Sequence, residues 1–258
     1  MKVNNKITHA GIIDGLAIIP TLMKFLAFDT STQALHLGVR NGERDLTQVH
    51  PGGAHASAQL IPSALGLLAQ AGLSLRDLDA IVMGQGPGSF TGLRTACAVA
   101  QGLAFGAGLP VLPIGTLLAV AEEAREGQAA LHVLSVLDAR MGQCYVAAWS
   151  HEAGSWHNVS PLALLHPHEV ALPPAWHSSP VPVCVAGTGW EGLLPQLQPP
   201  PQAGFSARHA APTAQALLRL APQALHSGLA VPAEHAMPLY VRDKVAQTTA
   251  EREARLAP

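Results

Sequence analysis

The chain has little charge, few aromatic residues and no excess of basic residues. Of its 258 residues, 12% are charged and 4% are aromatic, and the net charge at pH 7 is −2. An average globular domain has about 25% charged residues, whereas disordered chains and nucleic-acid-binding domains carry more charge of one sign. With 48% hydrophobic residues, the composition predicts a compact protein with one or two cores. It also predicts that this chain alone binds nucleic acid poorly.

Motifs for metal and redox chemistry are absent as well. The cysteines are three widely separated residues, Cys97, Cys144 and Cys184, with no C-x-x-C pair. They are typical of small buried side chains in a reducing compartment. No H-E-x-x-H and no Cys/His ligand spacing occurs around the thirteen histidines. The sequence therefore predicts no metal site in this chain.

No apolar run is long enough to span a membrane. The run in residues 10–20 is interrupted by Asp14 and is shorter than the ~20 residues that a spanning helix needs. Lys2 and Lys6 precede it, which faintly resembles a signal peptide, but no small-residue cleavage site follows. Met23 opens a strand pattern as a natural start would. We expect residues 1–22 to be an extension outside the fold, with a signal peptide as the alternative.

Residues 80–110 organise the chain. Ala80 to Met83 predicts a buried strand, the glycine-rich turn at 84–88 ends it, and a helix is expected from Ser89 or Thr91 to about Gly106. Such a turn directs backbone N–H groups at whatever lies over the helix start and is a natural anion site. However, the P-loop lysine after the last glycine is missing and the dinucleotide glycine pattern fails at Thr91. A tight turn without a ligand is the alternative.

The helix in this stretch is lined with small residues. They recur along its length at Ala96, Ala98, Ala100, Gly102, Ala104 and Gly106. Small side chains let another helix approach closely. Either the helix is buried within its own domain, or one of its faces meets a partner chain, and periodicity does not decide between them.

The remaining pattern alternates strands with helices. An antiparallel meander is expected at 24–28, 35–39 and 43–49, because Asn41-Gly42 is a strong hairpin signal. An apolar strand is followed by an aspartate, a short turn and a second strand at Asp29, and the same succession recurs at Asp138. Further elements are expected as helices at 55–71, 117–125 and 212–225, strands at 111–114, 131–137, 144–148 and 181–186, and an extended segment at 238–242.

Five stretches together resemble one known family. They are FDTST at 28–32, GQGPGSFTGLR at 84–94, DARMGQCYVA at 138–147, GTGW at 187–190 and PLYVRDKVA at 238–246. In this order they resemble the TsaB family, the partner of TsaD in bacterial tRNA threonylcarbamoyladenosine synthesis. The resemblance covers Met23 to about Ala246.

The resemblance implies an actin-like ATPase-domain (ASKHA) fold of two α/β lobes, each opened by a strand–Asp–turn–strand unit. The first lobe is expected at 23–125 plus 206–246 and the second at 126–205, with 247–258 as a mobile tail. A vestigial nucleotide site is implied at Asp29, Thr30, Gly86, Gly88, Asp138, Gly187 and Gly189. A partner interface on the two first-lobe helices is implied at Leu60, Ala64, Leu67, Leu68, Arg94, Cys97, Ala100 and Gln101.

The resemblance also implies a role without catalysis. In the related TsaD enzymes two histidines hold a metal, and the matching positions here are Thr116 and Val120, which are not a ligand pair. The chain is expected to activate TsaD in the cytoplasm, to join TsaE in a larger complex, to pair with itself when alone and to meet tRNA only indirectly. It needs no cofactor of its own, and ATP or ADP and metal are expected at TsaD.

Two other functions compete with this one. A small ATPase or kinase would place Asp29, Asp138 and the Gly187–Gly189 turn around a nucleotide, since an aspartate at a strand end can hold Mg²⁺ through water. A glycoprotease-like peptidase would need a nucleophile, but the residues around Ser89 read G-S-F-T-G rather than G-x-S-x-G.

Overall fold

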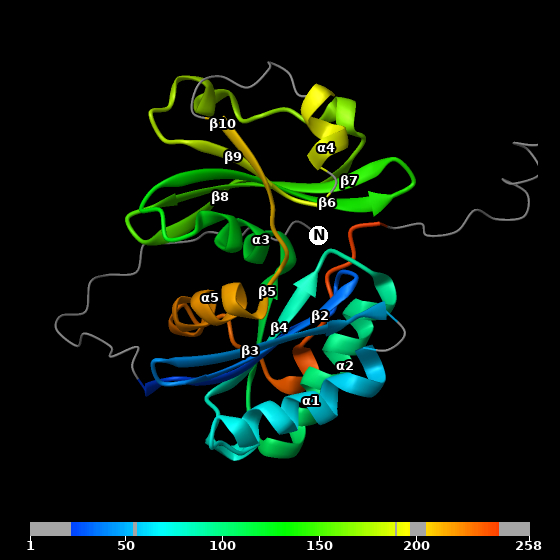
Figure 1. Cartoon of the computed structure of the whole chain (residues 1–258), viewed down its shortest axis with the longest axis vertical. Helices are drawn as coiled ribbons and strands as arrows, with labels where there is room; N and C mark the ends of the chain where they lie inside the picture. Colours follow the sequence, from blue (N-terminus) through cyan, green and yellow to red (C-terminus); the bar gives the residue numbers. More distant parts are fainter. Residues whose placement is uncertain (1–21, 54–55, 189, 197–204, 243–258) are drawn as a thin grey trace, which may run out of the picture.

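The computed structural model describes residues 22–53, 56–188, 190–196 and 205–242. Over these residues the chain forms two lobes, one above the other in Figure 1, each built on a five-stranded sheet. The strands are β1 (Lys24–Asp29), β2 (Ala34–Asn41), β3 (Arg44–Pro51), β4 (Ala80–Gly86), β5 (Val111–Gly115), β6 (Leu131–Arg140), β7 (Gln143–Glu152), β8 (Ser155–Leu165), β9 (Val183–Gly187) and β10 (Phe205–His209). The α-helices are α1 (Ala56–Gln70), α2 (Phe90–Ala107), α3 (Thr116–Arg125), α4 (Trp190–Leu193) and α5 (Ala214–His226).

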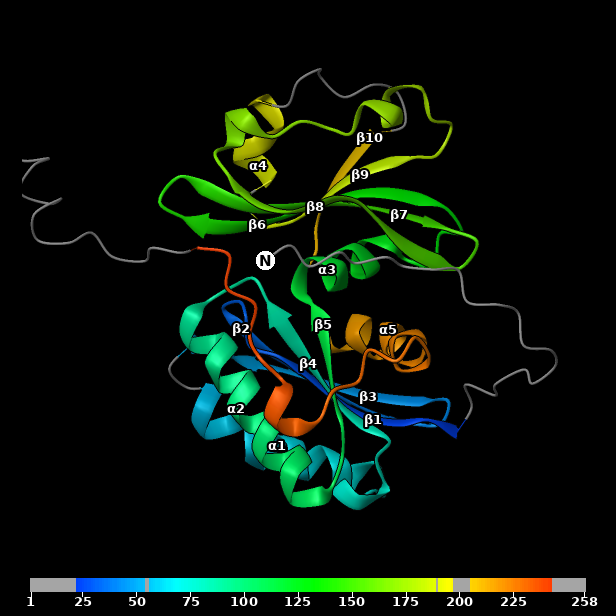
Figure 2. The same cartoon turned by 180° about the vertical axis from the view of Figure 1, so that it is seen from behind.

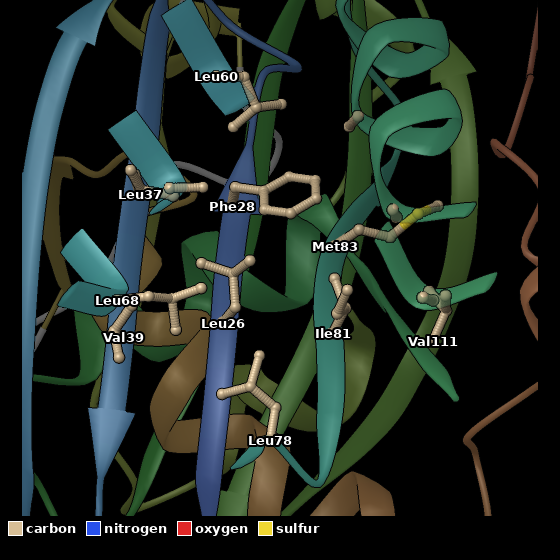
Figure 3. Close-up of a cluster of buried hydrophobic side chains, with 14 of the residues drawn as sticks. Leu26, Phe28, Leu37, Val39, Leu60, Leu68, Leu78, Ile81, Met83 and Val111 are labelled. Carbon is tan, nitrogen blue, oxygen red and sulfur yellow. The ribbon is translucent and has the colours of Figure 1, made fainter. Parts of the chain in front are cut away.

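The first lobe is a mixed sheet with helices on both faces. β1, β2 and β3 form the expected antiparallel meander, while β1, β4 and β5 run parallel, in the spatial order β3-β2-β1-β4-β5. Alternate residues of β1 point to opposite faces: Leu26 and Phe28 pack with α1 and α2, whereas Phe25 and Ala27 pack with α5. Figure 3 shows Leu60 and Leu68 of α1 directed at the same β1–β2 face as Phe28.

The second lobe repeats the strand order of the first. Its order β8-β7-β6-β9-β10 matches β3-β2-β1-β4-β5 strand for strand, with β6–β7–β8 antiparallel and β6, β9 and β10 parallel. Asp29 at the end of β1 and Asp138 near the end of β6 occupy corresponding places. The predicted actin-like architecture, with its duplicated strand–Asp–turn–strand unit, is confirmed.

The lobe boundaries differ from the expected ones at two places. β10 pairs in parallel with β9, so the second lobe extends to residue 209 rather than ending at 205. α3, placed in the first lobe by the sequence, packs Val120 and Ala124 into the core of the second lobe and lies between the two sheets (Figure 2). The expected extension and the tail at 247–258 lie outside the described residues, apart from Leu22.

Of the remaining segments, two agree with the sequence predictions and one was missed. α5 returns to the first lobe as predicted, and Ala233 and Ala236 join the core beside α2. The segment 238–242 is extended, and the Leu239 N–H donates to the Gln85 carbonyl oxygen at 2.8 Å. β8 was not predicted, because residues 151–179 show no regular alternation.

Candidate functional site

A cavity of about 600 Å³ opens between the lobes. The turn after β1, the start of α2 and the β6–β7 turn line it, and among its residues are Ser31, Ser89, Asp138, Tyr145 and Thr188. The structure therefore brings the two duplicated turns to one cleft, as the predicted nucleotide site requires. Of the residues predicted for that site, Gly88 and Asp138 line the cavity.

Asp29 does not face this cavity, because it is fully buried. Its Oδ1 accepts hydrogen bonds from the Ser31 N–H at 2.8 Å and from the Ser31 hydroxyl at 2.6 Å. Burial raises the pKa of Asp29 to about 6, against the lowering effect of hydrogen bonds from Ser31 and Thr116. Asp29 thus shapes the turn from inside, and the expectation that it faces a ligand is corrected.

Asp138, by contrast, is about half exposed. Its Oδ1 accepts from the Arg140 N–H at 2.7 Å, and its Oδ2 forms an ion pair with Arg140 at 3.2 Å. The carboxylate is the acidic group of the predicted pair that can reach a molecule in the cavity. Its charge already has a partner in Arg140.

At the glycines of the β4–α2 turn, other parts of the chain occupy the space that a side chain would take. A side chain on Gly92 would overlap the Thr30 carbonyl oxygen, and one on Gly84 would overlap the Asp29 carboxylate. The Thr30 hydroxyl donates to the Gly92 carbonyl oxygen at 2.7 Å, and the Ser89 N–H donates to the Ser31 carbonyl oxygen at 2.7 Å. The same close packing holds for Gly86, Gly88 and Gly187, whereas Gly189 lies outside the described residues. These contacts favour the ligand-free tight turn over an anion site at the glycines.

The predicted partner interface needs a larger correction. Six of its eight residues are at most 6% exposed and pack in the core of the first lobe: Leu60, Ala64, Leu67, Leu68, Cys97 and Ala100. Their helical spacing marks the face of each helix that is buried, and the sheet of the same lobe buries it. Arg94 is exposed, and Gln101 is half-buried and donates to the Ala236 carbonyl oxygen at 2.9 Å.

The other faces of the same two helices are exposed and almost uncharged. Ile61 and Leu65 of α1 are 40% and 46% exposed, and Phe105 of α2 is 81% exposed. α1 carries no charged residue, and α2 carries only Arg94. The two helices lie side by side on one face of the lobe in both Figures 1 and 2. We call this surface the α1–α2 face. The sequence signal for it was the lack of charge in both helices.

Thr116 and Val120, the positions that match the TsaD metal ligands, are both fully buried. The Thr116 hydroxyl oxygen accepts from the Gly86 N–H at 3.1 Å, and Val120 packs in the core between α3 and the second sheet. Within the described ranges, no group of three or more His, Cys, Asp or Glu residues is placed to hold a metal ion. In the same ranges, none of the helices combines the length and apolarity needed to span a membrane.

Comparisons with known proteins point to tRNA threonylcarbamoyladenosine biosynthesis. The family profile described as TsaD, tRNA N6-adenosine threonylcarbamoyltransferase, matches residues 48–174. The tRNA threonylcarbamoyladenosine biosynthesis protein TsaB of Escherichia coli is 36% identical over 87% of this chain and 96% of its own length. TsaB of Haemophilus influenzae is 42% identical over 48% of this chain and 52% of its own length.

Two solved structures share the fold at 35% sequence identity. YeaZ from Pseudomonas aeruginosa superimposes with a TM-score of 0.76 at 35% identity, over 85% of this chain and all of that one. A second structure, of an uncharacterized protein similar to peptidase YeaZ from Pseudomonas aeruginosa, gives a TM-score of 0.78 at 35% identity, over 86% of this chain and all of that one. Since the match to the Escherichia coli protein spans nearly both chains, this chain belongs to the TsaB family of tRNA threonylcarbamoyladenosine biosynthesis proteins.

Proposed function

We propose that this chain is an accessory subunit that binds TsaD through the α1–α2 face and activates it, without performing chemistry itself. The observation that carries this proposal is the exposed, uncharged surface around Ile61, Leu65 and Phe105. Exposed apolar surface of this kind marks a protein–protein contact. Activation by docking then means that the bound subunit stabilises the active conformation of TsaD.

The cleft supports a role without catalysis. Asp29 is buried, the glycines are packed against the chain, and Thr116 and Val120 are interior residues. We therefore expect no catalytic cofactor on this chain, and we expect the ATP or ADP and the metal of the reaction to bind at TsaD. In the same proposal, TsaE joins the larger complex, the chain pairs with itself when alone, tRNA is met mainly through TsaD, and the complex works in the cytoplasm.

A small ATPase is the second candidate, because the cavity beside Asp138 has room for a ligand. A peptidase has less support, since the Ser89 hydroxyl accepts from the Gly92 N–H as a helix cap and is not paired with a histidine in the described contacts. ATP hydrolysis by the purified chain, lost in Asp138→Asn, would favour the ATPase and contradict the accessory role.

The binding test uses TsaD from the same organism and isothermal titration calorimetry. Leu65→Glu and Phe105→Glu each place a charge in the α1–α2 face and are expected to weaken binding at least tenfold, since losing a well-buried apolar contact costs over ~1.4 kcal/mol. Val159→Glu is the matched control, because Val159 is similarly exposed at 41% but lies on β8 of the other lobe.

Reconstituted tRNA modification supplies the functional readout. With TsaD, TsaE, tRNA and threonylcarbamoyl-adenylate, omitting this chain should abolish product, and Leu65→Glu should lower it in parallel with binding. Full modification without the chain would refute activation. Unchanged binding of both glutamate variants would refute the α1–α2 face as the binding site. Activation of TsaD would then have to act through other contacts.

A further inference from the structure

The segment from Leu239 to Arg242 crosses from one lobe to the other. Its Leu239 N–H bonds to the Gln85 carbonyl oxygen in the first lobe. At its other end Arg242 donates to the Ala139 carbonyl oxygen at 3.1 Å and to the Gln143 side-chain oxygen at 2.9 Å, both in the second lobe. This crossing segment forms one wall of a second cavity of about 610 Å³, which adjoins the first and shares with it Gly88, Ser89, Ala139, Arg140 and Tyr145.

The second cavity is basic. Arg94, Arg140 and Arg242 all line it, and no Asp or Glu is among its described lining residues. The α2 helix begins at Phe90, which also lines the cavity, and the N-terminal end of this helix adds partial positive charge. Because Arg140 is paired with Asp138, the uncompensated positive charge of this cavity is that of Arg94 and Arg242.

Two of these arginines have no carboxylate partner within the described residues. The Arg94 Nε donates to the Tyr240 hydroxyl at 3.0 Å, and its guanidinium lies 3.8 Å above the centre of the Phe90 ring. Arg242 bonds only to neutral oxygens and to the Met141 sulfur. Neutral partners hold the two side chains in place without neutralising them, so their charge is available to an anion. Arginine is well suited to phosphate because its planar fork can donate two parallel hydrogen bonds.

Large apolar side chains lie beside the arginines. Phe90, Met141, Leu239 and Tyr240 are large hydrophobic residues that stay exposed, and all four line the cavity. Phe90 and Tyr240 are tilted neighbours with ring centres 5.5 Å apart. Aromatic rings next to a basic groove are the arrangement on which unpaired nucleobases stack while their phosphates bind to arginine.

We propose that this cavity binds a phosphorylated nucleoside, with its phosphate at Arg94 and Arg242 and its base against Tyr240. The site lies on the α2 side of the Gly88–Ser89 turn and borders the predicted nucleotide site, but Asp138 itself is not among its lining residues. It needs no partner protein, so its test is independent of TsaD and of the accessory role.

Two sources supply this chemistry, a free nucleotide and a nucleotide within a single-stranded RNA. The isolated chain is titrated with ADP by calorimetry and with a fluorescein-labelled 12-nucleotide RNA by anisotropy, both at low salt. Binding of ADP alone assigns a free nucleotide, and binding of RNA alone assigns a strand. Binding of both probes, each weakened by the same arginine substitutions, shows that the cavity recognises the phosphate and base that the two probes share.

Arg94→Gln and Arg242→Gln should each weaken the bound probe about tenfold or more, as expected for loss of a hydrogen bond to a charged group. Arg44→Gln makes the same charge change at an exposed position outside the cavity and should leave affinity within twofold. Thermal melts check folding, and because Arg94 is exposed its variant remains a valid test if Arg242→Gln is unstable. Binding of neither probe, or equal binding by the Arg94, Arg242 and Arg44 variants, would overturn the site.

Discussion

Asp29 is a carboxyl group held in the protein interior, and its protonation should be visible in stability. Burial raises its pKa from 3.8 to about 6. Between about pH 4 and pH 6 the folded state therefore keeps a proton that the unfolded chain releases, so stability falls as pH rises through this window and is constant above it with respect to this group. Two pKa units correspond to about 3 kcal/mol as an upper bound.

Asp29→Asn should remove this part of the pH dependence. Its amide oxygen can still accept from Ser31, and no charge is buried at neutral pH. The free energy of unfolding, measured with urea from pH 4 to pH 8, should decline less steeply for the variant than for the wild type between pH 4 and 6. Parallel curves for the two proteins would show that Asp29 is not protonated in the folded state at these pH values.

Two glycines of α2 offer a matched comparison of close packing and helix propensity. Gly92 lies against the Thr30 carbonyl oxygen, whereas Gly102 faces open space. Gly102→Ala should stabilise the protein by about 0.5–1 kcal/mol, because alanine is the better helix former. Gly92→Ala should destabilise it by about 2 kcal/mol or more, since the β1–β2 turn must move. Calorimetric melting temperatures measure both changes, and a shift of the same sign in both variants would contradict the packing explanation.

At the scale of the element, the sequence predicted what local patterns determine. The meander, the strand–turn–helix at 80–107 and the positions of α1, α3 and α5 follow from alternation, helical spacing and turn residues. β8 could not be found in the same way, because polar residues and Pro161 break its alternation and its strand partner in the described sheet is β7 alone. β10 is five residues long and pairs only with β9. Pairing partners far along the chain decide such strands.

The same limit explains the wrong assignment of the interface side chains. The family resemblance placed Leu60, Leu67 and Ala100 at an interface, and helical spacing does not say which surface buries them. The structure shows that the sheet of the first lobe does. The sequence did carry a signal for the opposite face, because Ile61, Leu65 and Phe105 lie in helices that are nearly free of charge.

Ala100→Trp distinguishes a core position from a surface position on α2. Ala100 is fully buried, so the indole must displace its neighbours and should cost at least about 3 kcal/mol of stability. Ala98→Trp on the exposed side of the same helix should leave the melting temperature almost unchanged. A wild-type melting temperature for Ala100→Trp, measured by circular dichroism, would show that Ala100 is not buried in the core.

At the scale of the whole molecule, the repeated Asp29 and Asp138 turns predicted a duplicated fold, and the identical strand orders of the two sheets confirm it. How the lobes are joined could not be predicted, because the joining residues are far apart in sequence. Glu122 of α3 accepts from Trp156 of β8 in the second lobe at 2.8 Å and from Arg219 of α5 in the first lobe at 2.7 Å. Arg125 adds two further hydrogen bonds to the same carboxylate.

Glu122→Gln should therefore destabilise the protein and weaken the connection between the two lobes. Although burial acts to raise the pKa of Glu122, hydrogen bonds from Arg125, Trp156 and Arg219 outweigh it and the pKa is lowered from 4.5. A lowered pKa means that the ionised group stabilises the fold above about pH 4.5 and that this stability is lost as pH falls below it. Removing the charge from a buried pair costs about 3 kcal/mol.

Urea unfolding at pH 7 should show this loss, and the difference from the wild type should shrink as the pH is lowered through 4.5. Glu43→Gln, at an exposed position in the β2–β3 turn, is the control and should change little at either pH. Because Glu122 contacts elements of both lobes, the variant should also separate a single unfolding transition into two, seen by tryptophan fluorescence and far-ultraviolet circular dichroism. An unchanged, single transition at pH 7 would mean that the crossing segment and the α3 core hold the lobes together without this carboxylate.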